Sequence, residues 1–296
     1  MADEHARLST LWQDFPAMRP LLRGVPLLQD CVAAYLDFGT NQGTRIEQLY
    51  RPRNPRYSQR QGVFATDWFR NVTRDKICVL GFEPNPLHWP RLRELQNQHT
   101  AAGRKLVIFP AAISANNSVA RFWSDNQHVR KYTGSSLLRV HKAMREANSW
   151  PVPTVSLDWL LREHVSPATP MAKAASADGI VSATSRMRVR AKMDIEGAEF
   201  DALPPAIEAM CSAVDSLQIE VHAGYLKNAE KRYSLPDGRG WNDKRARLSS
   251  LLRGVTCRRR RSRVTNKERA TLCAGAHGAA PCRTDVSNLW SGDPGH

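Results

Sequence analysis

Three apolar segments of this chain each end in a carboxylate that is followed by a turn. The first runs into Asp37, the second into Glu83, and the third into Asp194 and Glu196. Short apolar runs predict buried strands, and helical patterns follow each of the three. Strands alternating with helices predict an α/β fold with a doubly wound, mostly parallel sheet. In such a sheet the strand ends share one edge, where ligands bind.

The first segment, YLDFGTNQG at residues 35–43, has the pattern of a strand, a glycine turn and a helix beginning near Thr44. Gly39 and Gly43 would let the main chain pass close to a ligand and turn sharply. Asp37 would accept a hydrogen bond from a ligand's amine or hydroxyl group. A glycine pair also occurs in ordinary tight turns, so this segment alone leaves both interpretations open.

The second segment, ICVLGFEPNP at residues 77–86, again runs from a strand to an acid. An acid at the end of the second strand of a nucleotide-binding half-fold accepts hydrogen bonds from ribose hydroxyls. Pro84 and Pro86 predict an extended exit before the next helix. The alternative is that Glu83 is simply a solvated residue at a strand end.

The third segment, KMDIEGAEFDALP at residues 192–204, places two carboxylates one residue apart at a strand end. Gly197 follows them and predicts a turn at which the backbone approaches another group closely. Asp194 and Glu196 would then lie at the ligand-binding edge of the sheet. An acidic loop that caps the next helix is the alternative.

Together these segments resemble the FkbM-type family of S-adenosylmethionine-dependent methyltransferases. Further matching pieces, in the family's order, are AAIS at 111–114, GSSLL at 134–138, VPTVSLDWLL at 152–161 and LQIEVH at 217–222. The resemblance covers roughly residues 30–225. It implies a Rossmann-like fold of the class I methyltransferase type, S-adenosyl-L-methionine as cofactor and, usually, O-methyl transfer.

The matching motifs also imply site residues. The residues expected to bind the cofactor are Asp37, Gly39, Thr40, Asn41, Gly43, Glu83, Pro84 and Ala112. Those expected to act in catalysis are Asp194, Glu196, Glu220 and His222. By its usual pKa His222 is the natural base, although a hydrogen-bonded histidine at a strand end is an equal alternative. Three of these carboxylates could instead hold a divalent ion. Lone carboxylates are more often hydrogen-bond acceptors, so we assign no metal ligand.

The chain is expected to divide into an N-terminal extension at 1–29, a methyltransferase domain at 30–252 and a basic, poorly ordered tail at 253–296. A flexible Ala/Ser-rich loop is expected within the domain at 166–188. The family closes its sheet with an antiparallel pair of strands. Here the corresponding region holds CRRRRSRV and a Gly/Ala/Cys-rich stretch, so we expect the closing strands to be incomplete.

The formal net charge is +15, and residues 239–296 carry 13 Lys/Arg against 4 Asp/Glu, or +9 of the total. No aromatic residue interleaves with the arginines of 253–269, so a stacking platform for single strands is absent there and a nucleic-acid partner is disfavoured. Two alternatives remain: a nucleotide-dependent oxidoreductase on a similar fold, or a catalytically silent RNA-associated binding protein. The turn at 39–43 lacks the third glycine of GxGxxG, which counts against the oxidoreductase.

The N-terminus has early charges and no apolar core of a signal peptide, and no run approaches the ~20 apolar residues of a membrane span. We therefore expect a cytoplasmic enzyme, acting on a hydroxyl of a sugar, glycan or small metabolite. Three cysteines in apolar stretches, Cys31, Cys78 and Cys211, are expected to be buried free thiols. The cysteine spacings fit neither a disulfide framework nor a structural zinc site.

Overall fold

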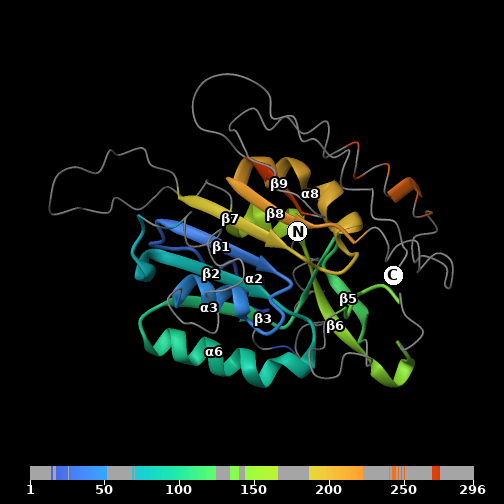
Figure 1. Ribbon diagram of the computed structural model, residues 1–296, viewed down its shortest axis with the longest axis horizontal. Helices are drawn as coiled ribbons and strands as arrows, with labels where there is room; N and C mark the ends of the chain where they lie inside the picture. Colours follow the sequence, from blue (N-terminus) through green and yellow to red (C-terminus); the bar gives the residue numbers. More distant parts are fainter. Residues whose placement is uncertain are drawn as a thin grey trace, which may run out of the picture.

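The computed structural model describes most of the chain between residues 15 and 250 and one later strand (Figure 1). The described residues are 15, 18–25, 27–51, 69, 71–124, 134–139, 144–165, 187–222, 240, 242–244, 246, 248, 250 and 269–273. The expected loop at 166–188, apart from its last two residues, and most of the expected tail at 253–296 lie outside them. So do residues 52–68, between the first two apolar segments.

The main sheet has six strands in the order β3-β2-β1-β7-β8-β9. The first five in this order are parallel, and β9 pairs antiparallel with β8. Their bounds are β1 (Ala33–Phe38), β2 (Ile77–Phe82), β3 (Lys105–Phe109), β7 (Arg188–Met193), β8 (Ser216–Glu220) and β9 (Arg269–Cys273). The predicted doubly wound, mostly parallel α/β sheet is therefore confirmed. The order reverses between β1 and β7, which makes the ends of these strands the expected ligand crevice.

Two hydrophobic cores lie on opposite faces of the sheet (Figure 1). One is covered by α3 (Thr44–Tyr50) and α6 (Trp89–Ala101), the other by α2 (Arg19–Leu22), α7 (Leu157–Leu160) and α8 (Glu199–Ala213). A π-helical turn, η6 (Leu161–Val165), continues α7, and short 3-10 turns occur at η2 (Arg74–Lys76), η3 (Pro86–His88) and η5 (Glu146–Asn148).

Successive side chains of β1 point to opposite faces of the sheet and so contribute to both cores. Ala34, Leu36 and Phe38 pack into the core under α7 and α8, whereas Ala33 and Tyr35 pack into the core under α3 and α6. All six residues of β1 are buried, which is typical of a central parallel strand with both faces covered.

A second sheet has three strands in the order β4-β6-β5. Its strands are β4 (Ala112–Ser114), β5 (Ser118–Trp123) and β6 (Ser149–Ser156), with β4 and β6 parallel and β5 antiparallel to β6. In Figure 1 this sheet lies beyond the arrowheads of the main sheet. It therefore forms a wall next to the strand ends at which the predicted site residues sit.

Two features near the ends of the chain bear on the expected boundaries. Met18 and Leu21 precede the expected domain, and both are fully buried in the core under α8. Near the C-terminus a single antiparallel strand, β9, pairs with β8, so among the described residues the family's closing pair is incomplete, as expected. No described helix is long and apolar enough to span a membrane.

The expectation of free thiols was wrong for Cys31 and Cys78. They form a disulfide between the start of β1 and the start of β2, with their Cα atoms 5.8 Å apart. Cys211 is also disulfide-bonded. The pairing of β1 with β2 sets Ala34 opposite Cys78 and so brings Cys31 within reach, although 47 positions separate the two cysteines in sequence.

Candidate functional site

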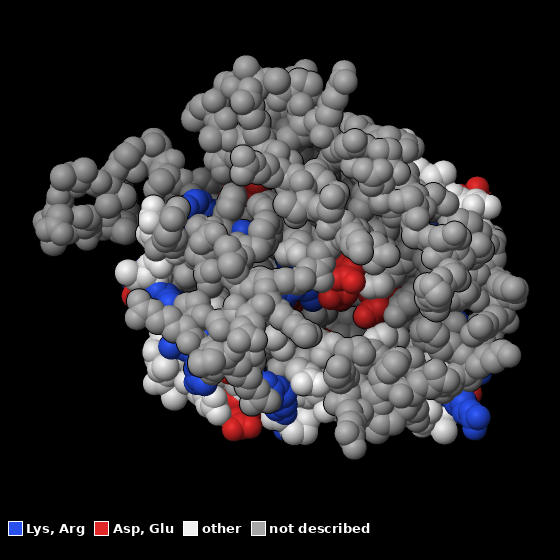
Figure 2. Space-filling model, viewed as in Figure 1, with Lys and Arg blue, Asp and Glu red and all other residues white. Residues whose placement is uncertain are grey.

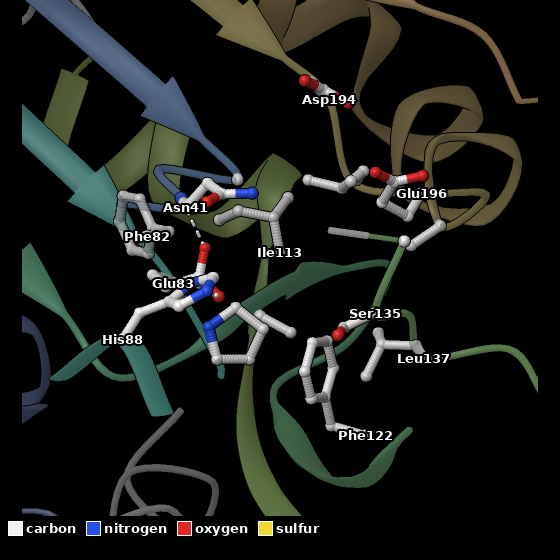
Figure 3. Close-up of a pocket in the computed structure, with 16 residues that line it drawn as sticks. Asn41, Phe82, Glu83, His88, Ile113, Phe122, Ser135, Leu137, Asp194 and Glu196 are labelled. Carbon is white, nitrogen blue, oxygen red and sulfur yellow. Dashed lines mark hydrogen bonds and ion pairs between the residues drawn. The ribbon is translucent and has the colours of Figure 1, made fainter. Parts of the chain in front are cut away.

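A pocket of about 550 Å³, including the solvent at its mouth, opens at the ends of β1, β2 and β7 (Figure 3). Figure 2 shows acidic side chains beside a hollow on this face. The lining residues are Gly39, Asn41, Phe82, Glu83, Pro84, His88, Ala112, Ile113, Phe122, Gly134, Ser135, Leu137, Asp194, Ile195, Glu196 and Ala198.

The glycine turn after β1 packs tightly against the segment after β7. Gly39 has φ +81°, and a Cβ there would lie 2.0 Å from the carbonyl oxygen of Asp194. Any other residue would force the two segments apart. Gly43 also has positive φ, at +79°, and a Cβ there would meet Leu95 of α6 at 2.3 Å. Gly39 thus shapes the pocket, whereas Gly43 serves the packing of α3 on α6.

Glu83 joins the first two strand ends. One carboxylate oxygen accepts a hydrogen bond from the main-chain N–H of Asn41 at 2.6 Å, and the other accepts from Asn85 at 2.9 Å. Figure 3 shows the Asn41 bond and places Glu83 at the pocket wall beside His88. A carboxylate has about four acceptor positions, so Glu83 can bind ligand hydroxyls while it holds both loops.

The remaining residues expected at the cofactor site fall into two groups. Pro84 and Ala112 line the pocket, as Gly39, Asn41 and Glu83 do. Asp37, Thr40 and Gly43 do not line it. The Thr40 hydroxyl donates to the carbonyl oxygen of Asp37 at 3.0 Å, so this side chain stabilises the turn from beneath.

Asp37 lies fully buried under the pocket floor. Neither of its carboxylate oxygens has a hydrogen-bond partner among the described residues. Burial raises the pKa of Asp37 to about 6, against the opposing effects of Lys192 and Arg45. Burying a charged carboxylate without hydrogen-bond donors costs folding free energy. Groups with shifted pKa values of this kind are concentrated at functional sites.

Lys192 supplies the cation closest to this acid. Its Nζ lies 3.7 Å from Asp37 and 3.3 Å from Asp194, and it donates to the carbonyl oxygen of Gly39 at 2.7 Å. Burial lowers the pKa of Lys192, but the two carboxylates outweigh that effect and the net shift is upward. Burial likewise raises the pKa of Asp194, but Lys192 and His222 outweigh it and the net shift is downward. The pair is therefore charged at neutral pH.

His222 sits among four carboxylates. Its Nε2 lies 3.2 Å from Glu196, 3.6 Å from Asp194 and 3.8 Å from Glu220, and its Nδ1 lies 3.4 Å from Glu199. Burial lowers the pKa of His222. The hydrogen bond with Glu199 and the charges of Glu199, Glu196 and Asp194 raise it more, to about 10. The four residues expected to act in catalysis thus come together, around an imidazolium ion.

Glu199 is a further residue of the site. It is fully buried, and its carboxylate accepts hydrogen bonds from the main-chain N–H groups of Gly197 at 2.8 Å and His222 at 2.6 Å. This carboxylate therefore ties the turn after β7 to the segment after β8. Neither N–H group belongs to α8, whose N-cap residue Ala198 has no side-chain capping hydrogen bond, so the capping interpretation of the acidic motif is not supported.

The same cluster has the donor set of a cation site. Asp194, Glu220 and His222 each offer a ligand atom, and these atoms lie within 4.8 Å of one another. Carboxylate oxygens and imidazole nitrogen suit several divalent ions. A metal would have to displace the proton of His222, whose raised pKa opposes that exchange.

Sequence reasoning missed Lys192, Glu199 and Ser136. Lys192 and Glu199 both belong to the KMDIEGAE motif, but their side chains point to main-chain atoms of other segments, and no sequence pattern reports such pairs. Ser136 belongs to the GSSLL motif, and its hydroxyl donates to the carbonyl oxygen of Glu196. All three residues lie within motifs that the sequence analysis singled out, but the motifs do not show what their side chains contact.

No protein-family model matches the sequence, and a comparison with curated proteins gave no match. Among solved structures, the crystal structure of a methyltransferase FkbM from Methylobacillus flagellatus KT aligns with 83% of this chain at 14% identity. The alignment has a TM-score of 0.34, and this chain spans about half of that protein, 51% of its length. A likeness at this level carries no argument about function, and the fold assignment rests on the topology of the sheet.

Proposed function

We propose that this protein is an S-adenosylmethionine-dependent methyltransferase that methylates a hydroxyl group of a sugar or another small metabolite. One observation carries the proposal: the pocket lies at the reversal point of the sheet and is lined by Glu83, Asp194 and Glu196, with no Lys or Arg among the described lining residues. An acidic pocket at this place suits a small cationic ligand.

The residues present fit that cofactor. It carries a sulfonium and an ammonium group, which the pocket carboxylates would stabilise, and a ribose whose hydroxyls Glu83 would bind. Gly39 lets the turn after β1 pack against the main chain of Asp194, because its position leaves no room for a Cβ. Beneath the floor, the Asp37 carboxylate lies 3.7 Å from Nζ of Lys192 and has no hydrogen-bond partner among the described residues. When bound, the cofactor supplies an electrophilic methyl group.

The same charges disfavour a dinucleotide. A pyrophosphate group needs donors or cations, and the three pocket carboxylates would repel it. The turn after β1 leads into a helix of only seven residues, capped by Gly43 without a side-chain hydrogen bond. The oxidoreductase alternative is therefore weaker than methyl transfer.

A carboxylate on the acidic side of the pocket would accept the proton of the acceptor's hydroxyl group. Displacement at a methyl group needs the acceptor oxygen held in line and, often, a group that takes its proton. His222 already carries a proton at neutral pH, so the ring is not free to take another. We assign the proton-accepting role to Asp194 or Glu196, which line the pocket, and a charge-stabilising role to His222.

The opposite wall suits an acceptor with both polar and apolar faces. Phe122 and Leu137 line it, facing Glu196 across the pocket (Figure 3). A sugar ring packs its C–H face on an aromatic side chain while its hydroxyls bind carboxylates. An anionic acceptor would meet repulsion from the acidic side.

Isothermal titration calorimetry on one sample tests the proposal. S-adenosylmethionine should bind, whereas NAD⁺ and a short single-stranded RNA should not. The titration should give the same affinity with and without EDTA, since our assignment contains no metal ligand. Binding of NAD⁺ alone would favour the oxidoreductase, and binding of RNA alone would favour the silent RNA-associated protein. Loss of S-adenosylmethionine binding in EDTA would indicate that a metal ion, rather than a proton, is bound to His222.

A further inference from the structure

Glu196 adopts a backbone conformation that a glutamate seldom occupies. Its φ is +56°, in the left-handed region, and Gly197 follows with φ +100°. A residue with a Cβ is held in this region only when its surroundings fix it there. The contacts of the peptide unit between Glu196 and Gly197 therefore decide where the Glu196 carboxylate points.

That peptide unit is held at both ends. Its carbonyl oxygen, which belongs to Glu196, accepts a hydrogen bond from the Ser136 hydroxyl at 2.5 Å. Its N–H group, which belongs to Gly197, donates to the buried Glu199 carboxylate at 2.8 Å. A donor on one side and an acceptor on the other fix the orientation of the peptide, because rotating it would break both bonds.

Ser136 is itself fixed in place. It is 1% exposed, and its main chain exchanges two hydrogen bonds with Trp123 of β5, at 2.9 and 2.8 Å. Its hydroxyl oxygen accepts a hydrogen bond from the N–H of Leu138 at 2.9 Å. Since the oxygen already accepts from Leu138, the hydroxyl proton is free to point at Glu196.

The neighbours of Ser136 face the pocket. Ser135 and Leu137 both line it, opposite Glu196 in Figure 3, while the hydroxyl between them reaches the main chain of Glu196. The wall assigned to the acceptor and the turn that carries an acid of the site are therefore joined by one hydroxyl group.

We propose that Ser136 is a positioning residue for Glu196: its hydroxyl locks the Glu196–Gly197 peptide and so holds the Glu196 carboxylate in the pocket, 3.2 Å from Nε2 of His222. The importance of this placement for methyl transfer rests on the proposed function. The placement itself does not, so it can be tested without cofactor or acceptor.

The test uses NMR of the ¹⁵N-labelled full chain. In Ser136→Ala the Leu138 amide loses its acceptor, and the Glu196–Gly197 peptide loses the donor to its carbonyl oxygen. Hydrogen exchange of the Leu138 amide, and of the Gly197 amide in the released peptide, should therefore accelerate about tenfold. The ring N–H signal of His222 should move toward its position in Glu196→Gln. Ser136→Thr keeps the hydroxyl and should restore the parent values.

Ser118→Ala is the matched control, because it removes another serine hydroxyl of the same small sheet, one that bonds Thr154. It should leave the Gly197 amide and the His222 signal unchanged. If Ser136→Ala does not fold, Ser136→Cys, which is close in size but a poor donor, provides the same comparison. Parent-like exchange at Gly197 and an unmoved His222 signal in the folded variant would overturn the proposal, whatever the outcome of cofactor titrations.

Discussion

Nζ of Lys192, on β7, donates a 2.7 Å hydrogen bond to the carbonyl oxygen of Gly39, in the turn after β1. The two residues are 153 positions apart in sequence. The same ammonium group lies between the carboxylates of Asp37 and Asp194. One buried cation thus joins the glycine turn to the acidic motif, and the electrostatics of the site depend on it.

Replacing Lys192 by Met should destabilise the protein by about 3–5 kcal/mol, because it leaves buried carboxylates without their cation. Urea unfolding followed by circular dichroism measures this. Adding Asp37→Asn to the variant should recover part of the loss, since it removes one of the uncompensated charges. Lys105→Met, at an exposed lysine, is the control and should change stability little. Equal effects of the two lysine variants would contradict the assigned role.

Asp37→Asn should stabilise the protein at pH 7.5 by roughly 1–3 kcal/mol. The folded pKa of Asp37, about 6, lies above its ordinary value of 3.8. Between these values the native state binds more protons than the unfolded state, so the free energy of unfolding falls as pH rises and stays lowered above about 6. Unfolding at several pH values measures this. If the unfolding free energies of the parent and of Asp37→Asn depend on pH in the same way between pH 4 and 6, the pKa of Asp37 is not raised.

Glu83→Ala should weaken binding of S-adenosylmethionine by about 1–3 kcal/mol, the range for hydrogen bonds to a charged group. Asp37→Ala should weaken it by less, through the lost charge alone, because Asp37 lies beneath the pocket rather than in it. Calorimetric titration gives the affinities. Glu146→Ala removes an exposed glutamate from outside the pocket and should bind as the parent does. Parent-like affinity in both site variants would place the cofactor elsewhere.

His222 should make stability depend on pH in the alkaline range. Its folded pKa, about 10, is raised above the ordinary histidine value of 6.5. The stabilisation is therefore complete below about pH 6.5 and is lost as pH rises toward 10, by at least about 1 kcal/mol. His222→Gln should remove this slope from the unfolding data, and His164→Gln, a histidine with a lowered pKa, should keep it. A parent protein with no alkaline slope would refute the carboxylate cluster around the ring.

The disulfide between Cys31 and Cys78 should stabilise the protein by up to about 4 kcal/mol, as expected for closing a loop of this length. Thermal unfolding of Cys31→Ser, compared with the parent under non-reducing conditions, measures the effect. Mass spectrometry of the alkylated, unreduced protein should find both cysteines unmodified. Alkylation of Cys31 and Cys78 without prior reduction would show that they are free thiols.

Local patterns were enough to predict the strands and helices that carry the site. The strand predicted before the glycine turn and the helix predicted to begin near Thr44 match β1 and α3, and the strand predicted to run into Glu83 matches β2. These elements are short apolar runs bounded by glycine or acids, so their type depends mainly on nearby residues. The helix predicted after the third segment spans Glu199–Ala213, and its ends are set by tertiary packing and by the Glu199 contacts.

The sequence by itself therefore determined the alternation of strands and helices, and which acids end the strands. Only the tertiary structure decided what those acids contact. It placed Asp37 beneath the pocket rather than in it, surrounded His222 with carboxylates that keep it protonated, and paired Ser136 with Glu196. A side chain's burial and charge neighbours come from segments far apart in the chain, and the pKa and orientation of each group follow from those neighbours.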